Sequence, residues 1–176
     1  TQAFVPADCT EWRTETVDLS AYDGEQITID FINNSGWGNW LYLDNIAVSG
    51  VVHLDIRVLL QGCYDVGLGE MTTALSSLFP LTQPYNVAPW SYAGVESVAS
   101  MPADITDWVL VELRDATTPS LTIARRAALL RKDGLIVDLD GTSPVGFDGL
   151  SLGDYHVVVR HRNHLGIMTN TPVTFN

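Results

Sequence analysis

WVLVEL, residues 108–113, is the stretch that decides the fold of this chain. It is a short apolar run of the kind that forms a β-strand. Two more strand patterns follow at residues 124–130 and 135–139, and the Lys-Asp-Gly turn between them at residues 132–134 carries the Asp-Gly signal of a β-hairpin. Antiparallel β-structure is therefore predicted for the centre of the chain.

Strand patterns continue on both sides of this centre. Residues 52–60 begin with strict alternation of apolar and polar side chains, which is typical of a half-buried strand. The residues predicted to share its apolar face are Val52, Leu54, Ile56 and Val58. Residues 155–160 alternate again, and residues 171–175 predict a closing strand.

The remaining stretch, residues 61–102, is predicted to be a long connection with prolines and aromatic residues, and with a helical turn at most at residues 69–75. No segment keeps a 3.6-residue apolar period with helix caps, and the two halves share no repeat. Short strands separated by Gly and Asp turns indicate an all-β fold, an Ig-like antiparallel β-sandwich over residues 51–176.

The first 50 residues are predicted to form a separate part. Residues 26–32 alternate with a period of two, residues 33–39 are a dense turn signal, and residues 40–48 predict another strand. Ser49-Gly50 then punctuates the chain, and we place a domain boundary there. Three or four strands cannot bury their own apolar side, so they need cover from the second domain, from missing residues of a longer protein, or from another subunit.

Acidic residues dominate the charge: 21 Asp and Glu against 9 Lys and Arg give a formal net charge of −12. Nucleic acids and anionic membranes reward positive charge, so neither is an expected partner. No apolar run reaches the roughly 18 residues that a membrane-spanning helix needs. The chain starts Thr-Gln-Ala-Phe, without an initiator Met or a signal peptide, and we interpret it as a processed or excised piece of a longer protein.

The two cysteines, Cys9 and Cys63, leave two interpretations open. They could form one disulfide, which only an oxidising compartment would keep, or each could fill a small buried position. Neither has a third Cys or a nearby His at zinc-ligand spacing, so a thiolate metal site is not expected.

Two runs in the first 50 residues resemble the end of a known module. WRTETVDLSAY at residues 12–22 is followed by LYLDNI at residues 41–46. Their order is similar to that in the last strands of the MAM-like, cleaved-adhesin and carbohydrate-binding jelly rolls of secreted bacterial proteins. Such modules are much longer. The resemblance therefore implies that residues 1–50 are the C-terminal strands of an incomplete jelly roll.

Residues 51–170 resemble a second module, a β-sandwich found near the C-termini of large bacterial surface proteins exported by type IX secretion. The runs that carry this resemblance are VHLDIRVLLQG at residues 52–62, DWVLVELRD at residues 107–115, RAALL at residues 126–130, DG at residues 133–134, DLDG at residues 138–141 and YHVVVRHRNHL at residues 155–165. The resemblance implies a secreted, extracellular cell-surface location and membership of a modular adhesin or fibrous protein. It implies no chemistry.

A structural calcium ion is the one cofactor for which the residues offer a pattern. Asp138 and Asp140 lie two apart and precede a glycine, so an extended segment would turn both carboxylates to one side. The EF-hand pattern fails, and Asp followed by Gly is also ordinary turn chemistry. Further acids that could add ligands are Asp148 and Asp154. In the jelly rolls that residues 1–50 resemble, an Asp in the final strand joins a calcium site, and Asp44 matches that position.

An aromatic loop offers a surface for sugar binding. Exposed indole rings beside polar side chains can stack on a pyranose and hydrogen-bond its hydroxyls, although aromatic residues of small sandwiches also fill core edges. The residues of this pattern are Trp37, Asn39, Trp40 and Tyr42. A second aromatic cluster lies in the long connection. There we favour a structural role, in which the aromatic side chains pin the connection to the sandwich. The residues of this second cluster are Tyr85, Trp90 and Tyr92.

Three histidines, His156, His161 and His164, surround two arginines, Arg160 and Arg162. Along a continuous strand His156 and His161 point to opposite faces, so the three histidines are not expected to converge on a metal. The arginines are instead expected to pair with acidic residues at the end of the strand.

Nucleophilic catalysis has no support in the sequence, which lacks a Gly-x-Ser-x-Gly elbow, a phosphate-binding loop and an evident His partner for either cysteine. The sequence favours a non-enzymatic structural or adhesive module of a secreted bacterial surface protein. Its expected partners are other copies of itself or neighbouring modules, and strand sharing between subunits could build a fibre. The alternative is a carbohydrate-binding module that tethers an enzyme or a cell to polysaccharide.

Overall fold

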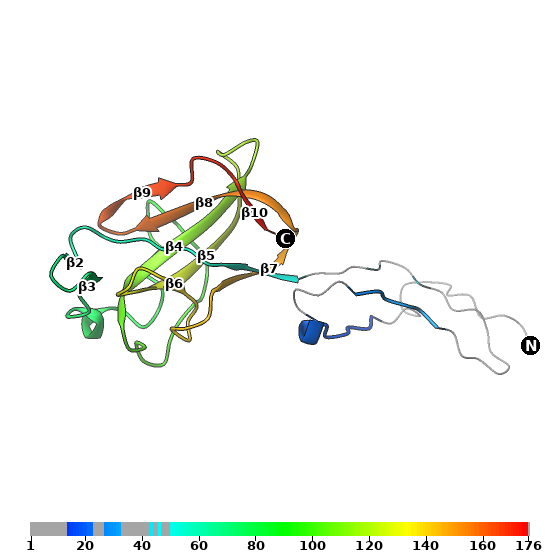
Figure 1. Cartoon of the computed structure of the whole chain (residues 1–176), viewed down its shortest axis with the longest axis horizontal. Coiled ribbons are helices and arrows are strands. Elements are labelled where there is room, and N and C mark those ends of the chain that lie inside the picture. Colours follow the sequence, from blue (N-terminus) through cyan, green and yellow to red (C-terminus); the bar gives the residue numbers. More distant parts are fainter. Residues whose placement is uncertain (1–13, 23–26, 33–42, 44–45, 47–49, 176) are drawn as a thin grey trace, which may run out of the picture. The chain divides into compact units, whose positions relative to one another are not determined.

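The computed structural model describes residues 14–22, 27–32, 43, 46 and 50–175 (Figure 1). The chain divides into two compact units, Thr1–Ala47 and Val48–Asn176. This division lies close to the boundary placed at Ser49-Gly50. In the described part of the first unit, the one regular element is the short 3-10 helix η2 (Ser20–Tyr22).

Residues 27–32 differ from what their alternation predicts. The sequence pattern predicts a paired strand, but these residues belong to no strand in the described part of the chain. Their apolar side chains remain at the surface, with Ile27 39%, Ile29 45% and Phe31 52% exposed. The segment thus has the side-chain pattern of a strand, but no strand in the described part of the chain pairs with it to form a sheet. The strand predicted at residues 40–48 lies mostly outside the described residues.

The second unit consists of antiparallel strands (Figure 1). Its strands are β1 (Gly50–Leu54), β2 (Tyr64–Asp65), β3 (Glu70–Met71), β4 (Ile105–Asp115), β5 (Thr122–Arg131), β6 (Ile136–Val137), β7 (Val145–Leu150), β8 (Gly153–His161), β9 (His164–Met168) and β10 (Val173–Phe175). The main sheet has the order β10-β8-β4-β5-β6, and β9 also pairs with β8. The pairs β1-β7 and β2-β3 form two small sheets.

Strand β4 is the centre of the main sheet, and its residues 105–113 are all buried. Val111 and Leu113 contribute to the sandwich core, the cluster in which the main sheet packs against β1 and β7. Trp108 and Leu110 point to the other face, where they form a second cluster with the long connection. Burial on both faces explains why the run at residues 108–113 is apolar almost throughout rather than alternating. The predicted all-β sandwich is confirmed.

The apolar face predicted for residues 52–60 is also confirmed. Val52 and Leu54 on β1 are 4% exposed, and Ile56 and Val58 pack half-buried against the sandwich core. Strand β1 ends at Leu54, but the amide of Val58 still donates to the carbonyl oxygen of Gly134 at 2.8 Å. The alternation of side chains therefore continues beyond the end of the strand ladder.

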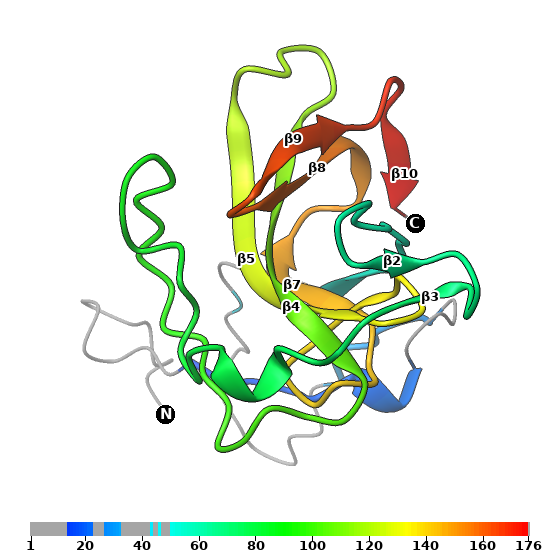
Figure 2. The ribbon, with the colours of Figure 1, turned by 90° about the vertical axis from the view of Figure 1, so that its left-hand side faces the viewer.

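The later part of the long connection, residues 79–101, packs on the second face of the main sheet, whereas Met71 in its first part belongs to the sandwich core (Figure 2). The 3-10 helix η3 (Ser76–Leu78) of the connection follows the predicted helical turn at residues 69–75, which contains β3 instead. Tyr85 is fully buried and donates its hydroxyl hydrogen to the carbonyl oxygen of Trp108 at 2.8 Å. The rings of Tyr85 and Trp90 meet edge to face, 5.2 Å apart. The prediction that aromatic side chains pin the connection to the sandwich is confirmed.

Candidate functional site

Several predicted site residues lie outside the described residues. They are the sugar-binding candidates Trp37, Asn39, Trp40 and Tyr42, the calcium candidate Asp44, and the cysteine Cys9. Their roles stay predictions. The described second unit contains the other predicted residues and one cluster that the sequence did not predict.

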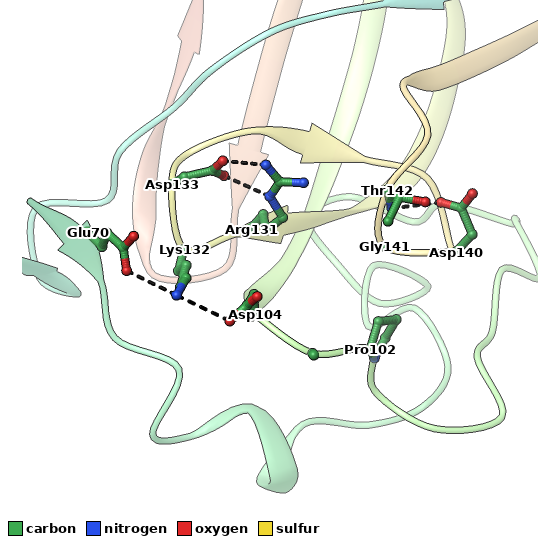
Figure 3. A pocket seen from close by; sticks show the side chains of 10 residues that line it. Glu70, Pro102, Asp104, Arg131, Lys132, Asp133, Asp140, Gly141 and Thr142 are labelled. Atoms are coloured by element: carbon green, nitrogen blue, oxygen red, sulfur yellow. Dashed lines mark hydrogen bonds and ion pairs between the residues drawn. The ribbon is translucent and has the colours of Figure 1, made fainter.

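A pocket of about 560 Å³ opens beside the turn between β5 and β6 (Figure 3). Lys132 places its Nζ 3.2 Å from Glu70 Oε2 and 3.3 Å from Asp104 Oδ1. Arg131 donates through Nε to Asp133 at 3.0 Å. The positive and negative side chains of the pocket wall pair with one another. The pocket is therefore lined by ion pairs and not by charges of a single sign.

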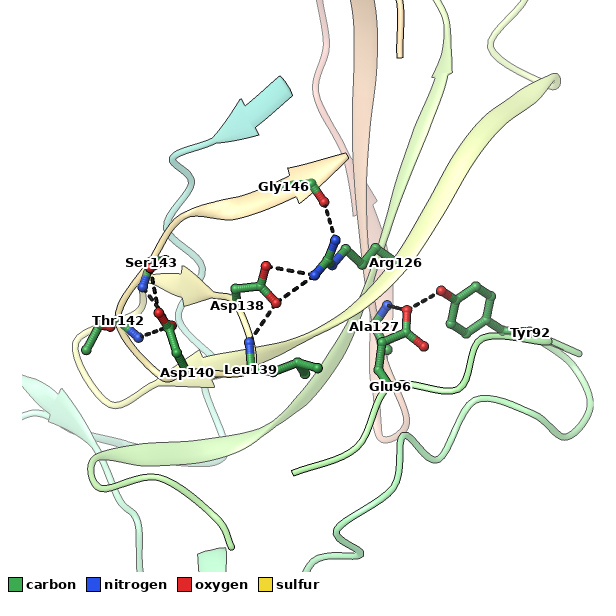
Figure 4. A network of polar contacts seen from close by, with 10 residues as sticks. All are labelled: Tyr92, Glu96, Arg126, Ala127, Asp138, Leu139, Asp140, Thr142, Ser143 and Gly146. Atoms are coloured by element: carbon green, nitrogen blue, oxygen red, sulfur yellow. Dashed lines mark hydrogen bonds and ion pairs between the residues drawn. The ribbon is translucent and has the colours of Figure 1, made fainter. Parts of the chain in front are cut away.

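Asp138 is held by an arginine from the neighbouring strand (Figure 4). Arg126 on β5 donates through Nη2 to both carboxylate oxygens, at 2.8 and 2.7 Å, and through Nη1 to the carbonyl oxygen of Gly146 at 2.8 Å. The amide of Leu139 donates to Asp138 Oδ1 at 2.7 Å. A guanidinium group thus supplies the positive charge that this carboxylate faces.

Asp140 closes the following turn (Figure 4). Its Oδ1 accepts from the amides of Thr142 and Ser143, both at 2.8 Å, and its Oδ2 accepts from the Ser143 hydroxyl at 2.5 Å. The Ser143 hydroxyl and the two amides lower the pKa of Asp140 to about 2. Figure 4 shows the carboxylates of Asp138 and Asp140 engaged with different partners. These contacts are those of ordinary turn chemistry.

The described part of the chain has no group of three or more His, Cys, Asp or Glu side chains placed to hold a metal ion. The calcium site predicted at Asp138 and Asp140 therefore gains no further ligand there. Asp154, one of the two acids that could have joined them, instead accepts a hydrogen bond from the hydroxyl of Thr174 at 2.6 Å.

Two of the three histidines meet at the turn between β8 and β9, where the chain bends. Strand β8 ends at His161, and the chain reverses so that His161 and His164 become cross-strand partners. Their Nδ1 atoms lie 2.9 Å apart. His156 stays separate, with Nδ1 3.0 Å from the carbonyl oxygen of Thr169. The three histidines therefore do not converge, as expected, and only His161 and His164 come together at the bend.

Asp107 on β4 extends this contact into a chain of polar groups. His161 Nε2 lies 3.0 Å from Asp107 Oδ2, and Arg162 donates through Nη2 to Asp107 Oδ1 at 2.6 Å. The side chains of Asp107 and His161 are only 7% and 5% exposed. A carboxylate this deeply buried needs partners, and the arginine and the imidazole provide them.

The proton positions on these rings follow from one backbone group. The amide of Asn163 lies 3.2 Å from His161 Nδ1, and an amide N–H can only donate. His161 Nδ1 therefore carries a lone pair, and its Nε2–H donates to Asp107. The hydrogen between the two rings must then belong to His164 Nδ1, which donates to His161 Nδ1.

The expected pairing of both arginines with acidic residues is confirmed. Besides the Arg162–Asp107 pair, Arg160 donates through Nε to Glu112 Oε1 at 2.9 Å, and Arg114 donates to Glu112 Oε2 at 2.8 Å. Burial alone would raise the pKa of Glu112, but the hydrogen bonds from the two arginines outweigh it and lower the pKa. Glu112 is thus a fixed anion inside the sheet.

Cys63 has a free thiol and lies half-buried against the sandwich core. Burial, followed by the negative charge of Asp107, raises the pKa of this thiol. A thiol of this kind is neither a ready nucleophile nor a metal ligand at neutral pH. Of the two interpretations that the sequence leaves open, the half-buried thiol of Cys63 fits the small buried position, and Cys9 lies outside the described residues.

Comparisons with protein-family models, with curated proteins and with solved structures found no match for this chain. Within the described residues, helices are confined to short 3-10 turns, and none is long and apolar enough to cross a membrane.

Proposed function

We propose that this chain is a non-enzymatic structural and adhesive module of a secreted bacterial surface protein, and that copies of it assemble by sharing strands. The observation that carries the proposal is the apolar segment at residues 27–32. It has the period of a strand, lies in no described strand, and leaves Ile29 and Phe31 about half exposed. A segment of this kind gains stability when a neighbouring strand covers it.

A groove in the first unit supports this proposal, because its apolar lining offers a neighbouring strand a surface to cover. It has a volume of about 430 Å³ and is lined by residues Leu19, Tyr22, Ile27, Thr28, Ile29 and Asp30. Covering these apolar side chains is worth roughly 25 cal/mol for each Å² removed from water. We assign the groove to a strand from another copy of the chain, because a head-to-tail contact of this kind repeats and builds a fibre.

The non-enzymatic part of the proposal is supported by where the polar side chains of the second unit lie. The carboxylates of Asp107, Glu112 and Asp138 are each held by arginines in structural pairs. Burial keeps the Cys63 thiol protonated. Secretion and a surface location are supported by the resemblance of residues 51–170 and by the net charge of −12.

Sedimentation velocity over a range of concentrations tests the assembly. The full chain is expected to form oligomers that grow with concentration, whereas the double variant Ile29→Ser, Phe31→Ser is expected to remain monomeric. Leu165→Ser is the matched control, because Leu165 is 94% exposed but lies on β9 in the second unit. A wild-type chain that stays monomeric at high concentration would contradict the proposal. Binding to insoluble polysaccharide that disappears in Trp37→Ala, Trp40→Ala would favour the carbohydrate-binding alternative.

A further inference from the structure

We propose that His161 and His164 form a two-step proton switch, which keeps the β8–β9 hairpin closed through the first added proton and opens it with the second. The switch concerns the second unit alone and does not depend on the assembly proposed above. It rests on the 2.9 Å contact between the two Nδ1 atoms and on the hydrogen bonds that fix which of them carries the hydrogen.

The first proton fits the closed hairpin. His164 already donates through Nδ1, so its free nitrogen is Nε2. That nitrogen borders Gly62, where even an added Cβ would lie 3.7 Å away. A proton taken up at Nε2 leaves the contact between the rings intact and makes it a hydrogen bond from a cation, which is stronger than a neutral one.

The second proton does not fit. The nitrogen of His161 that carries no hydrogen is Nδ1, and two donors, His164 Nδ1 and the amide of Asn163, already share its single lone pair. A hydrogen on this nitrogen would face two other N–H groups, with no acceptor left among them. The rings would have to separate, and with them the first residues of β9.

The charges around His161 and His164 also disfavour a second proton on the closed hairpin. Asp107 from β4 contacts His161 and Arg162 from the turn, and the half-buried thiol of Cys63 and the hydroxyl of Tyr85 lie close enough to Asp107 to feel its charge. Asp107 and Arg162 cancel one another in a 2.6 Å ion pair, and the Tyr85 hydroxyl hydrogen is donated to Trp108. Burial, followed by the charge of Asp107, raises the pKa of both Cys63 and Tyr85, so both stay neutral. No uncancelled negative charge remains among them to balance two charged rings.

Opening the hairpin would change the surface of the sheet. Strand β9 pairs with β8 through Val158, Val159 and His161, and the two valines are 4% exposed. Releasing β9 would leave the edge of β8 unpaired at residues 158–161, while β10 still pairs with residues 153–155. Such an edge is a template for pairing with another strand. Acid would thus create a new strand-accepting edge on this unit.

Hydrogen exchange of the β9 amides, corrected for the intrinsic effect of pH, measures the opening. As the pH falls from about 7.5 to about 5, exchange in wild type should rise by about tenfold or more. This pH window spans the titration of ordinary histidines and lies above that of ordinary carboxylates. His164→Asn should remove this rise, because its side-chain amide can donate to neutral His161 and, after flipping, accept from charged His161. His53→Gln, which changes an exposed histidine on β1, should behave as wild type.

Two results would overturn the proposal: no rise in the wild-type chain, or an equal rise in His164→Asn. A second measurement does not depend on the variant folding. Nitrogen NMR of the imidazole rings in the wild-type chain should show the hydrogen of His161 on Nε2 at about pH 7.5, and the first proton entering at His164. A hydrogen on Nδ1 of His161 at that pH would contradict the mechanism.

Discussion

Arg126 and Asp138 join three strands of the second unit through a single guanidinium group. The Nη2 atom of Arg126 lies 2.7 Å from Asp138 Oδ2, and the Nη1 atom donates to the Gly146 carbonyl oxygen on β7. Both side chains are about three-quarters buried. Because Asp138 directly follows β6, the contact fixes the path of the chain from β5 through β6 to β7.

Removing this carboxylate should destabilise the second unit. Asp138→Ala leaves a largely buried guanidinium without its partner, and the free energy of unfolding should fall by about 1.5–3 kcal/mol. Asp148→Ala is the control, since Asp148 is an exposed acid on β7, and it should change stability by less than about 0.5 kcal/mol. Denaturant unfolding of the two variants measures the difference. Equal losses would show that the ion pair does not hold the turn.

The two-sided burial of β4 predicts equal sensitivity on both of its faces. Leu113→Ala opens a cavity in the sandwich core and Leu110→Ala opens one beneath the long connection, and both residues are fully buried. Each should lose about 2–5 kcal/mol of stability, whereas the half-exposed Leu121 should tolerate the same change. If Leu110→Ala behaved like Leu121→Ala in thermal unfolding, the connection would not be packed on the sheet.

The turn at Asp140 predicts a definite pH dependence. The Ser143 hydroxyl and the amides of Thr142 and Ser143 lower the pKa of Asp140 to about 2 in the folded chain. The turn contacts therefore contribute stability in full above about pH 4, the range of an unfolded Asp, and lose it as the pH falls toward 2. Carbon NMR of the carboxyl group measures the midpoint directly.

Ser143→Ala removes the largest of these contacts and should raise the pKa of Asp140 toward its ordinary value. Thr142→Val keeps the backbone amide and should raise it less. An Asp140 midpoint that is the same in wild type and in Ser143→Ala would contradict the account of this turn. Added Ca²⁺ that stabilises wild type but not Asp140→Asn would favour the calcium interpretation of the same residues.

The Cys63 thiol should react slowly. Burial and the charge of Asp107 raise its pKa, so little thiolate is present at neutral pH. Alkylation by iodoacetamide, followed by mass spectrometry, should be slow in the folded chain and fast after unfolding. A peptide that contains Cys9 joined to Cys63 under non-reducing conditions would instead establish the disulfide that the sequence leaves open.

The sequence predicts the strands of the second unit best where side-chain pattern and burial agree. The runs at residues 108–113 and 124–130 lie inside β4 and β5, because β4 is buried along residues 105–113 and β5 is buried along its apolar residues 127–130. Strands β7 and β9 were missed, since glycines at Gly146, Gly149 and Gly166 interrupt their patterns. Their pairing depends on partners far away in the chain, which a local pattern does not contain.

The histidine pair could not be predicted from alternation alone. It depends on the chain reversing between His161 and His164, and the residues of that turn carry no Gly or Asn-Gly signal. One signal was present: Asp107 directly precedes the largely apolar run at residues 108–113, and a buried charge in that place needs a partner. The sequence indicated that a partner was needed, but the fold determines which residues supply it.

The central claim is that residues 27–32 gain a strand neighbour from another copy of the chain. Hydrogen–deuterium exchange of this segment, measured at low and at high protein concentration, tests it most directly. The account predicts amides that exchange quickly in dilute solution and become protected as the concentration rises, while the amides of β4 are protected throughout. Protection of residues 27–32 that is the same at every concentration would contradict it.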